Sequence, residues 1–116
     1  MDIDIIIPIY NAFDFVKKCI ETVIEHTDLT QHTLLLVNDK STDERILPLL
    51  NSFIKENQSL NIILIDNKDN QGFVRTVNIG MQYSHHDVVL LNSDTEVTRN
   101  WLSKIQNCAY SKPAVA

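Results

Sequence analysis

The chain has 116 residues, the length of one ordinary domain that can bury a core without cross-links. Its formal net charge of −5 argues against nucleic acid as a partner, because a phosphate backbone is bound by a basic surface. The first residues have no basic stretch and only a short apolar run, which argues against a signal peptide or a transmembrane segment.

The first predicted strand, Ile3–Ile9, is a nearly continuous isoleucine run, and Pro8 marks its end because proline has no N–H for a ladder. Apolar residues at spacings of 3 and 4 then predict an amphipathic helix. Its expected buried face is Phe15, Val16, Cys19, Ile20, Val23 and Ile24.

The second predicted strand is Thr33–Val37, and the polar run that follows it contains the N-cap candidates Ser41, Thr42 and Asp43. A second helix is predicted after them. Its expected buried face is Ile46, Leu47, Leu50, Phe53 and Ile54.

The third and fourth predicted strands are Asn61–Asp66 and Asp87–Leu91. The helix expected between them, over residues 72–83, has a weaker pattern, and Gly80 costs it about 1 kcal/mol relative to alanine. Its expected buried face is Val74, Val77 and Met81, and that of a last helix is Trp101, Leu102, Ile105, Cys108 and Ala109.

Strand and helix therefore alternate four times along the chain. The strand runs are continuous rather than alternating, which indicates strands covered on both faces, as in a parallel sheet. We predict a doubly wound α/β domain, a Rossmann-like half with a mostly parallel sheet and three layers, α/β/α. Ligands bind such sheets outside the carboxyl ends of the strands.

Polar residues gather at all four of these expected strand ends. Loop solvation and helix capping explain Ser41 and Asp43 well. They explain Asp39 and the group Asn92, Asp94 and Glu96 less well. The pattern thus favours a ligand site. Turn formation is the alternative for Asp94, and plain solvation is the alternative for Glu96.

The segment Asn92-Ser93-Asp94-Thr95-Glu96 offers the oxygen ligands that Mg²⁺ or Mn²⁺ prefers. A metal there would let an acidic protein bind a diphosphate. If the strand continues, Asn92, Asp94 and Glu96 would share one face, because side chains alternate along extended backbone.

The remaining cysteine, histidine and glycine residues give little sign of other chemistry. With only Gly72 and Gly80, the chain has neither a dinucleotide fingerprint nor a P-loop. The cysteines Cys19 and Cys108 have no metal-binding spacing, and we expect both to be buried thiols. We expect the histidines on the surface: His26, His32, His85 and His86. A reducing, cytoplasmic location is expected, with a membrane-peripheral full-length protein as the alternative.

Four motifs in order resemble the N-terminal, nucleotide-sugar-binding portion of a family 2 glycosyltransferase with the GT-A fold. They are IIIPIYNA, LLVNDKSTDE, DNQGFVRTVNIGM and DVVLLNSDTEV, and the last is followed by Trp101-Leu102 at the position of the family's next helix. The NSDTEV form most resembles the rhamnosyltransferase-like members. The second motif departs from the usual pattern, with Asn38 and Lys40 in place of aspartate and glycine.

The resemblance implies a role for each matching residue. Asp39 would accept a hydrogen bond from the base, and Gly72 would permit close backbone approach. Asp94 would bind Mg²⁺ or Mn²⁺ on the diphosphate, with the neutral Asn92 in the first position of the metal motif. The full nucleotide-binding set implied by the resemblance is Pro8, Tyr10, Asn11, Asp39, Gly72, Arg75 and Asn78.

The resemblance also implies the reaction, an inverting transfer of the sugar from UDP, dTDP or GDP to an acceptor hydroxyl. The acceptor would be a glycan, a lipid-linked molecule or a protein, as in polysaccharide biosynthesis. Family members supply the general base downstream of the metal motif, yet no acid follows Glu96 in this chain. We therefore expect residues 1–116 to be one nucleotide-sugar-binding domain of a truncated enzyme that lacks the acceptor-binding portion and is poorly active alone.

Two alternatives belong to other classes of protein. A non-catalytic interaction domain with a degenerate GT-A fold would explain the altered second motif and the missing base. A receiver-type signalling module also has acids at strand ends, but it needs a lysine at a late strand end, and none is found here.

Overall fold

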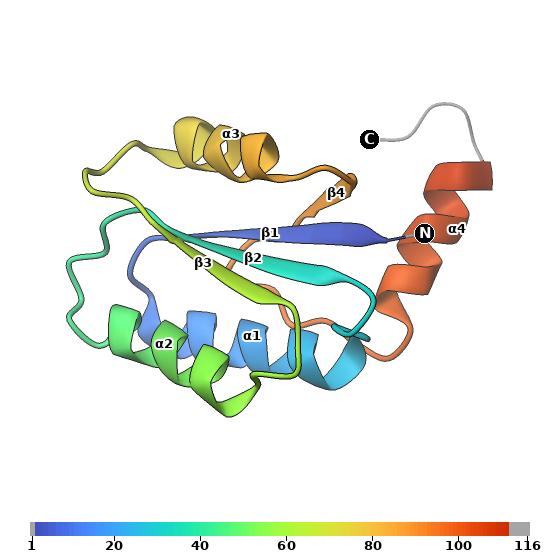
Figure 1. Ribbon diagram of the computed structural model, residues 1–116, viewed down its shortest axis with the longest axis horizontal. Helices are drawn as coiled ribbons and strands as arrows, with labels where there is room; N and C mark the ends of the chain where they lie inside the picture. Colours follow the sequence, from blue (N-terminus) through green and yellow to red (C-terminus); the bar gives the residue numbers. More distant parts are fainter. Residues whose placement is uncertain (1, 112–116) are drawn as a thin grey trace.

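The structure is a computed structural model that describes residues 2–111, with side chains described through residue 108. The chain alternates strand and helix throughout, as predicted (Figure 1). The elements are β1 (Ile3–Ile9), α1 (Phe13–His26), β2 (Thr33–Asn38), α2 (Ile46–Glu56), β3 (Ile62–Asp66), α3 (Phe73–Tyr83), β4 (Asp87–Leu90) and α4 (Trp101–Ser111). The predicted strand boundaries are confirmed to within one residue.

The four strands form one parallel sheet in the order β3-β2-β1-β4. The chain builds outward from β1 to β3 and then returns to place β4 on the other side of β1. In the register, Ile6 of β1 lies opposite Leu35 of β2 and Leu90 of β4. The change of direction between β1 and β4 is a topological switch point, where doubly wound sheets bind their ligands.

Helices cover both faces of the sheet, α1 and α2 on one side and α3 on the other (Figure 1). Because side chains alternate along a strand, Ile5 and Ile7 of β1 face α1, whereas Ile6 packs with Leu35 and Val37 beneath α3. The prediction of a doubly wound α/β domain with three layers is confirmed.

Gly80 has a packing role that its sequence pattern did not show. A Cβ atom built at Gly80 would lie 2.9 Å from Cγ2 of Ile6, so glycine lets α3 approach β1 closely. The buried face of α3 is consequently Thr76, Val77 and Gly80. The predicted face was wrong at two positions, since Val74 and Met81 are exposed.

We predicted that every strand would be covered on both faces, and this is confirmed only for β1 and β2. Their apolar residues are buried, whereas Ile63 of β3 and Leu90 of β4 are exposed. The reason is position: β3 and β4 are the outer strands of the described sheet, and α3 packs against β1 and β2.

Several single-residue predictions were wrong. His32 is buried, because its Nδ1 accepts a hydrogen bond of 3.0 Å from the backbone N–H of Ile3. Cys19 is buried as predicted, but Cys108 is exposed, two helical turns further along α4 than the packed residues Trp101 and Leu102. Phe15, Leu47 and Ile105 are also exposed, and the side chain of Ala109 lies outside the described residues.

The N-cap candidates before α2 have divided roles. Asp43 Oδ1 accepts the backbone N–H of Arg45, the residue that precedes the helix, at 3.0 Å. Ser41 and Thr42 instead accept hydrogen bonds from Asn11, in the loop after β1. Within the described residues, none of the helices has the length and apolar character needed to span a bilayer.

Candidate functional site

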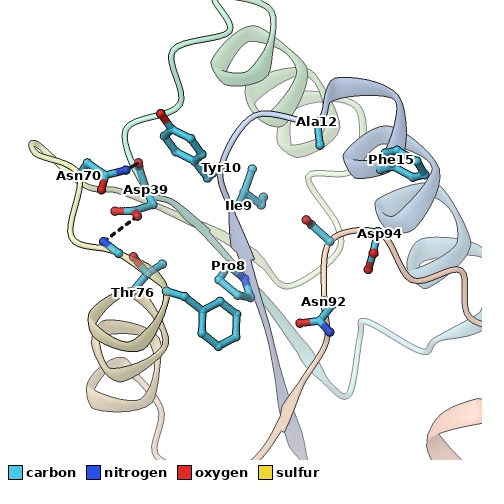
Figure 2. A pocket seen from close by; sticks show the side chains of 13 residues that line it. Pro8, Ile9, Tyr10, Ala12, Phe15, Asp39, Asn70, Thr76, Asn92 and Asp94 are labelled. Carbon is cyan, nitrogen blue, oxygen red and sulfur yellow. Dashed lines mark hydrogen bonds between the residues drawn. The ribbon is translucent and has the colours of Figure 1, made fainter.

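An open cavity of about 720 Å³ lies where β1, β2 and β4 end (Figure 2). Four separate stretches of the sequence meet around it. Its lining residues are Pro8, Ile9, Tyr10, Ala12, Phe15, Asp39, Asn70, Gly72, Phe73, Thr76, Asn92, Ser93 and Asp94.

Asp39 organises one side of this cavity. Its Oδ1 accepts hydrogen bonds from Gln71 N at 2.7 Å and Asn67 Nδ2 at 3.0 Å, and its Oδ2 accepts one from Gly72 N at 3.0 Å. The Asn70 side chain donates to the Asp39 carbonyl at 3.2 Å (Figure 2). The carboxylate thus fixes the loop that leads into α3, and we call this side the Asp39 wall (Asp39, Asn67, Asn70, Gly72 and Thr76).

The charge state of Asp39 follows from these contacts. Burial acts to raise the pKa of its carboxyl, but the hydrogen bonds from Gln71, Asn67, Thr76 and Gly72 outweigh burial, and the net shift is downward. Asp39 is therefore an ionised acceptor at the cavity wall at neutral pH.

Asn11 joins the loops after β1 and β2. Its backbone N–H donates to Ser41 Oγ at 2.9 Å, its Nδ2 donates to Thr42 Oγ1 at 2.9 Å, and its Oδ1 accepts from Asp43 N at 2.9 Å. Asn11 and Ala12 both have a positive φ, of 55° and 58°. This left-handed turn carries the chain from β1 into α1 and leaves Asn11 outside the cavity lining.

The structure shows what each of the two departures in the second motif changes locally. Lys40 has a φ of 55°, the left-handed conformation that favours glycine, so a glycine at this position would be unstrained. Asn38 is buried, and its Nδ2 donates to Asp66 Oδ1 at 3.0 Å. An aspartate at position 38 would set a second carboxylate against Asp66, and the amide avoids that repulsion.

The opposite side of the cavity is formed by Asn92, Ser93 and Asp94, which we call the Asp94 wall. Figure 2 shows Asn92 and Asp94 across from Asp39, with Pro8 and Ile9 of β1 between the two walls. After Leu91 the backbone turns, and Thr95 N donates to Asn92 O at 3.1 Å. The expectation that Asn92, Asp94 and Glu96 share one extended face was therefore wrong, and Glu96 lies outside the cavity lining.

The chemistry of the Asp94 wall suits a hard divalent cation. Asn92 and Asp94 are exposed and present one amide oxygen and one carboxylate to the cavity. Within residues 2–111, no cluster of three or more His, Cys, Asp or Glu side chains is placed to hold a metal. The protein thus offers a partial ligand set, as at Mg²⁺ sites that share the ion with substrate phosphates.

A buried thiol lies directly behind the Asp94 wall. Cys19 Sγ donates to the carbonyl of Asn92 at 3.7 Å. Burial raises the pKa of Cys19 to about 12, against a smaller lowering by the hydrogen bond with Thr95, and the charge of Asp94 also raises it. Cys19 therefore stays protonated at neutral pH.

Six of the nine predicted site residues line this one cavity, and three do not. Pro8, Tyr10, Asp39, Gly72, Asn92 and Asp94 form the first group. Asn11 braces the loops behind the cavity, and Arg75 and Asn78 are exposed on α3 outside the lining. The roles assigned to all nine remain predictions.

Sequence reasoning missed other cavity residues, among them Phe15, Asn70, Phe73 and Thr76. Phe15 was assigned to the core by its helical spacing, but it is 62% exposed at the cavity. Asn70 and Phe73 belong to a stretch that carries the family resemblance, so that stretch was the available signal. Thr76 belongs to the same stretch, whereas no local pattern pointed to Asn67, its buried partner within the Asp39 wall.

This arrangement, a parallel sheet with a polar cavity at its switch point, is that of a GT-A domain. The chain belongs to glycosyl transferase family 2, since the family's sequence model matches residues 4–116. The family is thereby settled by the sequence match, and the fold agrees with it.

Curated relatives share about a third of their aligned residues with the chain. Polypeptide N-acetylgalactosaminyltransferase 11 of Xenopus tropicalis is 31% identical over 87% of this chain and 17% of its own length. Poly(ribitol-phosphate) beta-glucosyltransferase of Bacillus spizizenii is 33% identical over 62% of this chain and 11% of its own length. The chain therefore spans less than a fifth of either relative.

Solved structures show the same fold at lower identity. The mannosyltransferase PcManGT of Pyrobaculum calidifontis, solved with GDP-Man and Mn²⁺, superposes with a TM-score of 0.86 at 17% identity. The match covers 97% of this chain and 33% of that protein. TarS of S. aureus, solved with UDP-GlcNAc, gives a TM-score of 0.77 at 17% identity over 96% of this chain and 32% of that chain.

Proposed function

We propose that this domain binds a nucleoside-diphosphate sugar together with Mg²⁺ or Mn²⁺, as the donor-binding portion of a glycosyltransferase. The observation that carries the proposal is the placement of the Asp39 and Asp94 walls on opposite sides of one cavity at the switch point. A volume of about 720 Å³ suits a ligand of nucleotide size. The family membership and the ligands of the solved neighbours support the same ligand class.

Each wall has its own part in this proposal. Asp39 is ionised and accepts hydrogen bonds, so it suits a base with an N–H donor, as in UDP, dTDP or GDP. Tyr10 lines the cavity and is 49% exposed, which leaves its ring available to a base. Asn92 and Asp94 would hold the divalent ion, which as a Lewis acid would stabilise the leaving diphosphate.

The acceptor side of the reaction is a separate part of the proposal. We place the acceptor site and the general base in a further part of the enzyme, because no Asp or Glu follows Glu96 in this chain. Residues 1–116 would then be one donor-binding domain of a cytoplasmic enzyme. In the proposed inverting reaction, an acceptor hydroxyl attacks the anomeric carbon from the face opposite the diphosphate.

Calorimetric titration tests donor binding directly. The 116-residue chain is titrated with UDP, dTDP and GDP in Mn²⁺, in Mg²⁺ and in EDTA. We expect at least one nucleotide to bind more tightly with a metal than in EDTA. A folded sample in which no nucleotide shows metal-dependent binding contradicts the proposal and favours the alternative of a non-catalytic domain.

Two matched variants locate the metal within the cavity. We expect Asp94→Ala to abolish the metal-dependent part of the affinity, and Glu96→Ala to retain it, because Glu96 lies outside the cavity lining. An Asp94→Ala variant that binds as well as the unaltered chain overturns the assignment of the metal.

A further inference from the structure

The segment between β4 and α4, residues 91–100, carries Asn92 and Asp94 but has no helix or strand of its own. Figure 1 shows it leaving β4 and running past α1 toward α4. A metal site needs ligands held in a defined geometry, so the question is what fixes this segment.

Three hydrogen bonds tie the segment and the start of α4 to α1 and to its C-cap residue, Thr27. At one end Cys19 Sγ donates to Asn92 O at 3.7 Å. One helical turn later, Thr22 Oγ1 accepts the backbone N–H of Val97 at 3.1 Å. At the far end Thr27 Oγ1 accepts from Trp101 Nε1 at 2.8 Å. The segment therefore lies along α1 and runs in the same direction.

Thr22 has a hydroxyl group that serves two partners at once. Its proton is donated to the carbonyl of Cys19 at 2.8 Å, which leaves the oxygen free to accept from Val97. Both Thr22 and Val97 are buried. Without this hydroxyl the Val97 N–H would be left buried without its partner, at the full cost of desolvation.

These contacts reach the segment through its backbone. Cys19 holds the carbonyl of Asn92 and Thr22 holds the amide of Val97, so the chain is fixed on either side of Asp94. The side chains of Asn92 and Asp94 remain exposed to the cavity. Contacts from α1 thus hold the backbone, while the oxygen ligands of the side chains face the cavity.

We propose that Cys19 and Thr22 are positioning residues for the metal–diphosphate site, holding the Asn92–Asp94 backbone in its ligand-binding conformation from α1. This inference rests on the proposed function. Fixing the segment in advance lowers the conformational entropy that binding must remove, so loss of a contact weakens the metal-dependent part of the affinity.

Variants at Thr22 test the inference. Thr22→Val removes the hydroxyl and keeps the shape, whereas Thr22→Ser keeps the hydroxyl. We expect Thr22→Val to reduce the gain in nucleotide affinity that Mn²⁺ gives over EDTA by about tenfold, the factor that one hydrogen bond of this kind provides. Affinity in EDTA should be unchanged, and Thr22→Ser should restore most of the gain.

Ser52→Ala is the matched control. Ser52 Oγ donates to the carbonyl three residues earlier in α2, at 2.7 Å, as Thr22 does in α1, but Ser52 is not part of the cavity lining. A general loss of stability would affect both variants, so we expect Ser52→Ala to keep the full gain from Mn²⁺. Hydrogen exchange gives a readout without ligand: the Val97 amide should lose protection in Thr22→Val and keep it in Ser52→Ala.

The outcomes separate this inference from the proposed function. If the unaltered chain gains affinity with Mn²⁺ and Thr22→Val gains as much, the positioning role is overturned and donor binding stands. Equal losses in Thr22→Val and Ser52→Ala would also overturn it, because the effect would then be one of stability. An unaltered chain with no gain from Mn²⁺ overturns both.

Discussion

The two walls of the cavity are built in opposite ways. The Asp39 wall is a network of side chains whose polar groups largely bind one another, with Asp39, Asn67 and Thr76 all buried. The Asp94 wall is held through backbone atoms of Asn92, Thr95 and Val97, and the side chains of Asn92 and Asp94 are exposed. One wall is ordered by contacts within the protein before a ligand arrives, whereas the other presents its oxygens to one.

The difference predicts that stability depends on the first wall and metal-dependent binding on the second. Substitutions in the Asp39 wall should destabilise the fold even when no ligand is present. Substitutions in the Asp94 wall should leave the stability of the fold nearly unchanged and weaken metal-dependent binding.

The largest expected effect is at Asp39. Asp39→Ala leaves the amide of Asn67 and the backbone N–H groups of Gln71 and Gly72 without their acceptor, so we expect unfolding to become easier by about 3 kcal/mol. Urea denaturation measures the change. In the same experiment Asp94→Ala should lie within about 0.5 kcal/mol of the unaltered chain, and similar losses for both would refute the contrast.

The next effect concerns the helix that positions the first wall. Gly80→Ala places a methyl group against Ile6, and overpacking of this kind costs about 1–3 kcal/mol, of which the better helix propensity of alanine returns about 1 kcal/mol. We expect a net loss of about 1 kcal/mol by urea denaturation. A second substitution, Ile6→Val, removes the Cδ1 atom that lies 3.1 Å from the built Cβ, so Gly80→Ala should cost less in an Ile6→Val background than in the unaltered chain. A stabilised Gly80→Ala variant would show that the close approach is absent.

A smaller effect is expected from pH. The pKa of Asp39 is lowered in the folded state, against about 3.9 in an unfolded chain, so its charge stabilises the fold above about pH 4. That contribution disappears as the pH falls from about 4 through the folded pKa. The acid side of the stability curve, measured by urea denaturation, should therefore be less steep in Asp39→Asn. An identical slope in both proteins would contradict an ionised, hydrogen-bonded Asp39.

Other carboxyl groups contribute equally to the pH dependence of stability in the unaltered chain and in Asp39→Asn. Asp43 is one, because its hydrogen bond with the side chain of Arg45 lowers its pKa to about 2. The difference between the two pH curves is therefore specific to position 39.

The smallest effect is at Lys40, beside the same wall. Its φ of 55° costs about 1 kcal/mol in a residue with a Cβ, and glycine removes that strain but adds entropy to the unfolded chain. We expect Lys40→Gly to raise the free energy of unfolding by about 0.5 kcal/mol. Lys40→Ala removes the same charge and keeps the strain, so it should show no gain; a gain in both would point to charge instead.

Much of the fold was predictable because its signals are local. Strands β1 and β2 are nearly continuous apolar stretches, and their boundaries followed from the sequence pattern alone. The helix faces were harder, since Val74 and Phe15 have helical spacing yet are exposed. Which face of a helix is buried depends on the neighbour, and Gly80 against Ile6 is a contact between residues 74 positions apart in the sequence.

The candidate site divides in the same way. The positions of Asp39, Asn92 and Asp94 at the cavity were predictable because each follows an apolar strand sequence, at the edge where parallel sheets bind ligands. The contacts of Asn67, Cys19 and Thr22 were not, because their partners are 9 to 75 positions away. No local pattern encodes such a partner.

The sequence by itself determined the order of elements, the parallel sheet and the chemistry at the strand ends, since periodicity and residue type act over a few neighbours. Only the tertiary structure decided which polar residues satisfy one another and which face the cavity. That choice depends on how α1, α3 and the segment after β4 pack on the sheet. The same packing makes Asp39 an acceptor surrounded by donors and leaves Asp94 exposed at the cavity.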